Sequence, residues 1–327
     1  MAFRACRVFE EAGRVAPRLV EMSPDELSPG DVVVRVQCSG INYKDALAVT
    51  GRGKILKRFP LNAGIAASGV VESSEDARFR PGDAVVVNGM GLGESHDGGF
   101  AEVLRVPGDW VVPLPAGLTL RESMILGTAG FTAALAIVRM ETNGQAPSKG
   151  AIVVTGATGG VGSVAVSILA ARGYRVLACS GRPEHADYLR GLGAAEVKTP
   201  AELDLGSRPL EPARFGGVVD NVGGGLLAGL VRHVGLWGQV ACIGMAASHE
   251  LATSVFPLIL RGVSLLGVSS GNCPMPLRHE VWARLGADLK PPHLDAIASR
   301  EVSLDAVIET APLLMERRAL GRVLVRC

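Results

Sequence analysis

Short apolar runs separated by proline and glycine fill the first 122 residues of the chain. Residues 100–106 alternate between apolar and polar side chains, which is the pattern of a half-buried strand. The other runs that we expect to form strands are residues 31–38, 68–72 and 84–87. Several short strands joined by tight turns predict a compact, barrel-like body. Residues 39–48 interrupt this pattern and are typical of a loop that leads into a short helix.

From about residue 123 the pattern changes to apolar strands that alternate with helices. Strands buried on both faces read as continuous apolar runs. Six such runs are present, at residues 151–154, 175–179, 195–197, 217–220, 238–244 and 263–268. Helical patterns stand between most of them, at residues 124–140, 163–171, 184–192 and 226–234. This alternation predicts an α/β fold in which residues 123–269 form a doubly wound parallel Rossmann sheet.

The last segment of the chain returns to a mixed pattern. Residues 280–289 and 303–320 read as helices, and residues 323–325 read as a strand. We expect residues 270–327 to return to the first domain, residues 1–122, and to complete it.

A strand, a glycine-rich turn and a helix follow one another from residue 151 onward. Residues 157–162 read A-x-G-x-x-G, whereas the usual dinucleotide fingerprint begins with glycine. The N-terminus of the helix would offer free N–H groups and the positive end of its dipole to a pyrophosphate. We therefore expect a dinucleotide to bind at Gly156, Ala157, Thr158, Gly159, Gly160, Val161 and Gly162. A plain strand-to-helix connection is the alternative interpretation.

The end of the next strand indicates which dinucleotide is bound. An NAD site usually has an acidic residue there, which binds the ribose 2′-hydroxyl. This strand instead ends in Ser180, Gly181 and Arg182. Serine and arginine side chains can bind a 2′-phosphate, so the sequence predicts NADP(H), although a solvated arginine in a loop is the alternative.

Three further strands of the sheet end in polar or glycine-rich segments. Ligands bind at the carboxyl ends of strands in such sheets, although each segment could equally be a turn without a ligand. The candidate cofactor contacts at these ends are Asn221, Ile243, Gly244, Gly267 and Ser269.

Polar, aromatic and ionisable groups are concentrated in Asn42, Tyr43, Lys44 and Asp45. These four residues are candidates for catalysis. The alternative is structural, because asparagine is a good N-cap and the following residues would then form a solvated helix start.

Composition narrows the classes of partner. The chain has 327 residues, of which 48% are hydrophobic and 20% charged, and a formal net charge of +1. This balance gives no reason to expect nucleic acid or a membrane as partner.

The first residues carry two arginines where a leader would be apolar, and no run of 18 apolar residues is present. Six scattered cysteines without a C-x-x-C pair suggest reduced thiols in a cytoplasmic protein.

The segments given at the end of this paragraph resemble those of the zinc-independent, quinone oxidoreductase-like medium-chain dehydrogenases/reductases. Within this family the chain is most similar to the YhdH/YhfP group, which includes acrylyl-CoA reductase. The resemblance covers essentially the whole chain. Its segments are residues 42–45, 51–55, 74–76, 91–96, 108–110, 127–133, 153–157, 180–182, 220, 267–268 and 321–322.

The resemblance implies a GroES-like barrel as the catalytic domain beside the Rossmann domain, with the substrate in the cleft between them. It also implies NADPH chemistry without metal. Zinc-using relatives carry a catalytic cysteine where this chain has Asn42, and Gly-His-Glu where it has residues 64–66. With no cysteine between Cys38 and Cys179, a structural four-cysteine lobe cannot form there.

Several residue roles follow from the same resemblance. Asn42 and Tyr43 are candidates for orienting substrate and nicotinamide. Thr128 is a candidate contact to the nicotinamide side, and Arg322 is expected among the cofactor contacts. The expected reaction is hydride transfer to the β-carbon of an enoyl thioester, acrylyl-CoA giving propionyl-CoA, followed by protonation of the enolate. The proton could come from Tyr43, from a relay through Lys44 and Asp45, or from water.

Two other functions remain open. One is an NADPH:quinone or other enone reductase, and the other is a non-catalytic NADPH-binding protein. The second has some support from Ala66, which stands where this family usually has aspartate. The basic residues 51–58 could receive the phosphates of CoA or could simply be solvated. A homodimer is expected by resemblance, with the apolar residues 256–268 as a candidate contact.

Overall fold

The computed structural model describes residues 2–327, which form two compact units. The first unit contains the chain up to Ala129 together with Ser270–Asp288 and Ile297–Cys327. The second contains Gly130–Ser269 and Leu289–Ala296.

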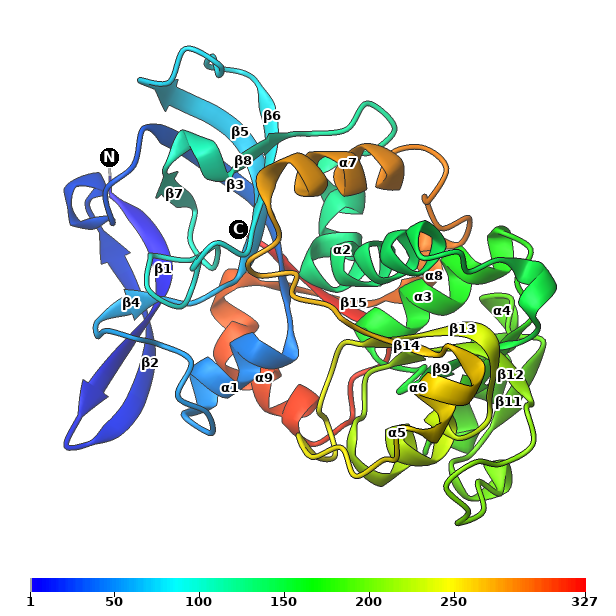
Figure 1. Ribbon diagram of the computed structural model, residues 1–327. Coiled ribbons are helices and arrows are strands. Elements are labelled where there is room, and N and C mark those ends of the chain that lie inside the picture. The colour runs from blue at the N-terminus through cyan, green and yellow to red at the C-terminus, as the bar shows by residue number, and fades with distance from the viewer. Residues whose placement is uncertain (1) are drawn as a thin grey trace. The chain divides into compact units, whose positions relative to one another are not determined.

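The first unit is built mainly from β-strands (Figure 1). Its strands are β1 (Phe3–Glu11), β2 (Arg14–Met22), β3 (Val32–Ile41), β4 (Leu61–Asn62), β5 (Ala66–Ser74), β6 (Ala84–Asn88), β7 (Val103–Val106), β8 (Val111–Pro113), β15 (Ala298–Ser303) and β16 (Arg322–Arg326). One sheet has the order β2-β1-β4. The larger sheet has the order β15-β16-β3-β5-β6-β8, and β7 also pairs with β3. Strand β16 thus brings the end of the chain against β3, in antiparallel register with Val323 opposite Ile41.

The β1–β2 hairpin has no counterpart among the strands predicted above. Its two strands pair in antiparallel register from Phe3–Met22 to Glu11–Arg14. The turn residues Ala12 and Gly13 have φ values of 49° and 73°. Two consecutive positive φ values suit a hairpin turn, but alanine is not the residue that normally signals one. Arginine and glutamate side chains also interrupt the apolar pattern of both strands.

Helices of the first unit pack against this β structure. They are α1 (Tyr43–Thr50), α7 (Met275–Leu285) and α9 (Val307–Met315), and α8 (Leu294–Ile297) lies at a unit boundary. Helices α1 and α9 lie side by side although they are far apart in sequence (Figure 1). Their buried residues, including Ala46, Val49 and Val307, share one hydrophobic core with Ile41 and Val323. This core fixes the first turn of α1 against β3 and β16.

The second unit contains a six-stranded sheet. Its strands are β9 (Ile152–Thr155), β10 (Val176–Cys179), β11 (Glu196–Lys198), β12 (Phe215–Asp220), β13 (Val234–Cys242) and β14 (Ser264–Gly267). All pairs are parallel, and the order is β11-β10-β9-β12-β13-β14. Counted along the chain, this is the order 3-2-1-4-5-6 of a Rossmann sheet. The predicted doubly wound parallel sheet is confirmed.

Helices of this unit include α3 (Gly160–Ala171), α4 (Ala186–Gly191), α5 (Gly224–Val231) and α6 (Phe256–Arg261). Short 3-10 helices occur in both units, at Pro24–Glu26, Gly108–Trp110, Pro147–Lys149, Pro183–His185, Ala201–Leu203 and Leu304–Ala306.

Helix α2 (Leu120–Thr142) is interrupted by Gly127, whose φ of 49° and ψ of −149° are not helical. Among the described residues it is the one helix long and apolar enough to cross a membrane. However, 89% of its most apolar window is buried inside the protein. A core helix has the same properties.

Candidate active site and cofactor-binding residues

The turn between β9 and α3 explains how alanine fits at the first position of the fingerprint. Gly156 adopts a φ of 58°, which disfavours any side chain, while Ala157 is fully buried and donates its N–H to the Cys179 oxygen at 3.2 Å. The left-handed residue is therefore Gly156, so residue 157 can carry a methyl group. A Cβ on Gly162 would lie 2.4 Å from the Gly156 oxygen, so only glycine fits there.

Helix α3 begins directly behind this turn, with Gly159 as its N-cap and Gly160 and Val161 in its first turn. Its first N–H groups have no partner within the helix and carry the positive end of the helix dipole. A tight turn that brings backbone close to the start of a helix has the geometry that a pyrophosphate requires. These residues fit the dinucleotide expected from the sequence.

Thr158, Ser180 and Arg182 form one polar cluster beside this turn. Arg182 donates from Nε to the Thr158 hydroxyl at 3.1 Å and from Nη2 to the Thr158 oxygen at 3.2 Å. The Ser180 hydroxyl lies 3.3 Å from that of Thr158 and accepts the Arg182 backbone N–H at 3.1 Å. Partial burial lowers the pKa of Arg182. A Cβ built on Gly181 would meet nothing within 4 Å, whereas Thr158 and Ser180 are each 4% exposed.

Asp220 joins the carboxyl ends of β9 and β12. Its fully buried carboxylate accepts the Thr155 hydroxyl at 2.7 Å and the Gly223 N–H at 2.7 Å. Burial raises the pKa of Asp220. Asn221 donates its side-chain amide to the Thr155 oxygen at 2.8 Å, so this predicted cofactor contact also anchors the glycine-rich turn.

The other predicted strand-end residues follow β13 and β14, which lie progressively farther from β9 in the sheet. Ile243 and Gly244 follow β13 and donate to the Asp220 oxygen at 2.9 and 3.2 Å. Gly267 ends the edge strand β14, and its oxygen accepts a hydrogen bond from Arg139. Ser269 is exposed two residues further on. The structure thus groups Ile243 and Gly244 with Asn221, and leaves Gly267 and Ser269 at the sheet edge.

In the first unit, the side chains of residues 42–45 separate into two pairs. Asp45 is 1% exposed and accepts the Asn42 backbone N–H at 2.8 Å, the Asn42 side-chain amide at 2.9 Å and the Ile65 N–H at 2.9 Å. Burial raises the pKa of Asp45 to about 6, against the lowering effect of these hydrogen bonds and of Arg322. Asp45 is therefore part of the protein interior, and Asn42 beside it is partly buried.

Tyr43 and Lys44 have the opposite environment. Tyr43 is 49% exposed at the first position of α1. The Lys44 ammonium forms an ion pair with Glu94 at 2.8 Å. Tyr43 is therefore the residue of this segment that can meet a ligand most directly.

Arg322 does not have the environment expected of a direct cofactor contact. It is 2% exposed and donates to the Ile125 oxygen at 3.0 Å, the Ile41 oxygen at 3.2 Å and the Asn42 side-chain oxygen at 3.0 Å. The sequence marked Arg322 only as part of a Gly-Arg pair. It could not show that two segments distant in sequence, residues 41–42 and 124–125, supply the acceptors of the guanidinium. Thr128 lies one residue beyond the Gly127 kink, close along the chain to the Ile125 oxygen that Arg322 holds.

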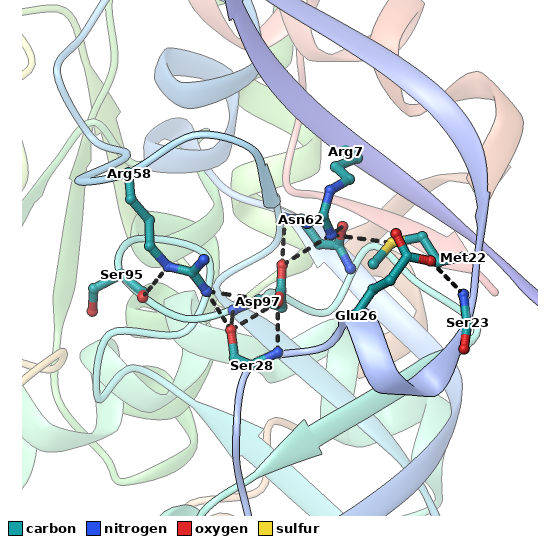
Figure 2. Close-up of polar contacts among 9 residues, drawn as sticks. All are labelled: Arg7, Met22, Ser23, Glu26, Ser28, Arg58, Asn62, Ser95 and Asp97. Atoms are coloured by element: carbon teal, nitrogen blue, oxygen red, sulfur yellow. Dashed lines mark hydrogen bonds and ion pairs between the residues drawn. The ribbon is translucent and has the colours of Figure 1, made fainter.

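A polar cluster around Asp97 was not identified from the sequence. Figure 2 shows its fully buried carboxylate between Ser28, Asn62, Arg7 and Arg58. It accepts the Ser28 hydroxyl at 2.7 Å and the Asn62 N–H at 2.9 Å, and its oxygens lie 3.5 and 3.7 Å from the two guanidinium groups. The cluster joins four separate segments of the first unit. An acid that follows a glycine-rich loop carries no local signal that would distinguish it from a solvated one.

The positions that bind catalytic zinc in related enzymes hold no metal ligands here. The side chain of Asn42 is hydrogen-bonded to Asp45 and Arg322, and residues 64–66 offer neither imidazole nor carboxylate. Within residues 2–327, no three His, Cys, Asp or Glu side chains come together as a metal site.

Comparisons with known proteins extend over the whole chain. The family described as alcohol dehydrogenase GroES-like domain matches residues 28–116, and the family described as zinc-binding dehydrogenase matches residues 160–287. The GroES-like part of the predicted fold is thereby confirmed.

Three individual proteins are similar over nearly their full length. The putative quinone oxidoreductase YhfP of Bacillus subtilis is 46% identical, covering 99% of this chain and 98% of its own, and its structure with NAD bound has a TM-score of 0.98 over 100% of both chains. The probable acrylyl-CoA reductase AcuI of Escherichia coli is 44% identical over 99% of each chain. The yhdH oxidoreductase of Salmonella enterica, solved in complex with NADP, is 43% identical with a TM-score of 0.96 over 99% of each chain. The chain therefore belongs to the zinc-independent, quinone oxidoreductase-like group of medium-chain dehydrogenases/reductases, and it is an oxidoreductase of that group.

Proposed function

We propose that this protein is an NADPH-dependent reductase of activated carbon–carbon double bonds, and that acrylyl-CoA is its substrate. The cluster of Thr158, Ser180 and Arg182 is the observation that carries the cofactor half of this proposal. It provides hydroxyl groups and a guanidinium, and no carboxylate, where the 2′ position of the adenosine ribose is expected.

The names of the relatives support the same cofactor and chemistry. One relative was solved with NADP and another with NAD, so the fold accepts both dinucleotides. The cationic cluster favours the phosphorylated form in this chain. Gly156 and Gly162 give the backbone the close approach that the pyrophosphate needs, and α3 presents its N-terminus there.

NADPH, when bound, supplies the hydride for the β-carbon of the substrate. The charge that then builds on the substrate carbonyl oxygen must be met by hydrogen-bond donors. Tyr43 is exposed and has a hydroxyl suited to this role and to delivery of the final proton. Lys44 is ion-paired to Glu94 and Asp45 is enclosed, so a relay through these two residues has less support.

Substrate choice between a CoA thioester and a quinone depends on charge near α1. In the basic residues 51–58, Arg58 is held by Ser95 and by the Asp97 cluster (Figure 2). Arg52, Lys54 and Lys57 are exposed and form no ion pair with other described residues. Three uncompensated cations suit the phosphates of CoA and have no role with a quinone. This favours acrylyl-CoA, the substrate in the name of AcuI, over a quinone, as in the name of YhfP.

Transfer of a labelled hydride tests the proposed reaction. NADPH deuterated at the transferable position is incubated with acrylyl-CoA, and the product is analysed by mass spectrometry and NMR. We expect propionyl-CoA with one deuterium at the β-carbon. Tight NADPH binding without any labelled product from enoyl-CoA, enone or quinone would instead indicate the non-catalytic alternative.

We further propose that the protein is a cytoplasmic homodimer. No disulfide joins any of the six cysteines, all of which lie in the described part of the chain, and this suits a reducing compartment. Large apolar side chains of β13 and α6 are exposed, namely Leu236 at 69%, Trp237 at 67%, Phe256 at 50%, Ile259 at 73% and Leu260 at 57%. Such a concentration marks an interaction surface, and the adjacent edge strand β14 has an unpaired side. Light scattering should give twice the chain mass for the native protein and the single chain mass for Trp237→Glu/Ile259→Glu; a native monomer would refute the dimer.

A further inference from the structure

Arg322 is a buried cation without a direct acidic partner. Its guanidinium contacts backbone oxygens and the Asn42 side chain, and it forms no ion pair with any described carboxylate. A buried charge is costly unless it is compensated. The charge that acts on it is that of Asp45. The guanidinium of Arg322 and the carboxylate of Asp45 must therefore stabilise each other through the side chain that lies between them.

The Asn42 side chain lies between these two charges. Its oxygen accepts from Arg322 Nη1 at 3.0 Å, and its Nδ2 donates to Asp45 Oδ2 at 2.9 Å and to the Gly40 oxygen at 3.1 Å. The amide dipole thus points its negative end at the cation and its positive end at the anion. Rotating the amide by half a turn would place donor against donor and acceptor against acceptor. The network therefore allows only one orientation of Asn42.

Asp45 transmits this constraint to the backbone. Its Oδ2 accepts the Asn42 N–H at 2.8 Å, and its Oδ1 accepts the Ile65 N–H at 2.9 Å. The backbone is thereby fixed on both sides of Tyr43, at residue 42 and at residue 45. Arg322 also binds the Ile125 oxygen, two residues before the Gly127 kink and three before Thr128.

We infer that Arg322, Asn42 and Asp45 form a relay of hydrogen bonds between two buried charges, and that this relay holds Tyr43 and Thr128 in position for the reaction. The inference rests on the proposed function, in which these two residues meet substrate and nicotinamide. Arg322, Asn42 and Asp45 are positioning residues, since each acts through its neighbours. Arg322 joins the last strand of the chain, the start of α1 and the kink of α2 at one guanidinium.

A kinetic double-mutant cycle tests whether Arg322 acts through Tyr43. Arg322→Lys keeps the charge but cannot reach three acceptors at once. Small displacements of reacting groups cost up to about 100-fold in rate, so we expect kcat to fall by about 10- to 100-fold while KM changes little. In a Tyr43→Phe background the same substitution should have a much smaller effect on kcat, because only its influence on Thr128 remains. Equal losses in both backgrounds would overturn the inference.

A second measurement separates the relay from the proposed function, because it needs no substrate. Backbone hydrogen exchange at Asn42 and Ile65 reports on the two N–H groups that Asp45 accepts. Exchange at both should accelerate in Arg322→Met and, to a smaller extent, in Arg322→Lys, which keeps the charge but loses acceptors. It should be unchanged in Arg326→Met, a matched control at an exposed residue of the same strand. Unchanged exchange in Arg322→Met would refute the relay even if the enzyme reduces acrylyl-CoA. Accelerated exchange in a protein that reduces no enone would support the relay and refute the proposed function.

Discussion

Arg182 reaches back across the glycine-rich turn to Thr158, with its Nε 3.1 Å from the threonine hydroxyl and its Nη2 3.2 Å from the threonine oxygen. The strand that carries Arg182 and the turn that precedes α3 therefore meet at one polar cluster. A phosphate at that cluster would face a guanidinium that is already oriented.

The first prediction concerns cofactor choice. Arg182→Ala should weaken NADPH binding by about 1.5–3 kcal/mol, the contribution of a hydrogen bond to a charged group. NADH binding should change little, because NADH lacks the phosphate. Titration of each cofactor by fluorescence measures both dissociation constants. Equal weakening for both would show that Arg182 supports the turn rather than the 2′-phosphate.

The second prediction concerns Tyr43. Tyr43→Phe removes the hydroxyl but keeps the ring, so NADPH affinity should be nearly unchanged. The loss of a proton donor or oxyanion donor should reduce kcat by about 100-fold or more. Steady-state kinetics at saturating NADPH measures this. A rate equal to that of the native enzyme would exclude Tyr43 as an obligatory donor and leave water as the source of the proton.

The third prediction concerns the pH dependence of stability at Asp45. Its folded pKa of about 6 lies above its ordinary value of 3.8 because burial disfavours the charged form. Between these two values the folded state binds a proton that the unfolded state has lost, so stability falls as pH rises. The other titrating groups coupled to it are Arg322 and the thiol of Cys6.

Native protein and Asp45→Asn should therefore diverge with pH in urea unfolding. The native free energy of unfolding, relative to that of the variant, should decrease between about pH 4 and pH 6 by at most about 3 kcal/mol. Above that range the difference should be constant. A difference that increases over the same range would mean that hydrogen bonds and Arg322 outweigh the burial of Asp45.

The fourth prediction concerns the basic residues after α1. Replacing Arg52, Lys54 and Lys57 with glutamine should raise KM for acrylyl-CoA about 10-fold at low salt, as expected for loss of three exposed charge contacts. The effect should shrink at high salt, which screens such contacts. KM for a quinone is the internal control and should not change. A parallel rise for both substrates would mean that the segment shapes the site instead of binding phosphates.

The sequence was sufficient to predict the parallel sheet of the second unit, because the signals for it are local. Continuous apolar strands, the glycine-rich turn and the strand end at Ser180 each depend on residues that are neighbours in the chain. The β1–β2 hairpin was missed because Ala12 adopts a positive φ without a residue type that announces it. Arg322 and Asp97 required the structure, because the partners of each come from two or more distant segments.

The residues at the start of α1 show the same limit on a smaller scale. The sequence identified residues 42–45 as one candidate group and left capping open as an alternative. The structure divides them, with Asp45 buried, Asn42 partly buried and hydrogen-bonded to it, and Tyr43 exposed. Burial of a polar side chain depends on residues such as Ile65 and Arg322, which no local pattern brings together.

The central claim is NADPH-dependent reduction of an acrylyl thioester. Its most direct test is the loss of NADPH absorbance with acrylyl-CoA and, in parallel, with a quinone, using the same native enzyme. We predict saturable oxidation of NADPH with acrylyl-CoA, a higher kcat/KM than with the quinone, and a much lower rate with NADH. Saturable turnover of the quinone with none of acrylyl-CoA would contradict this account.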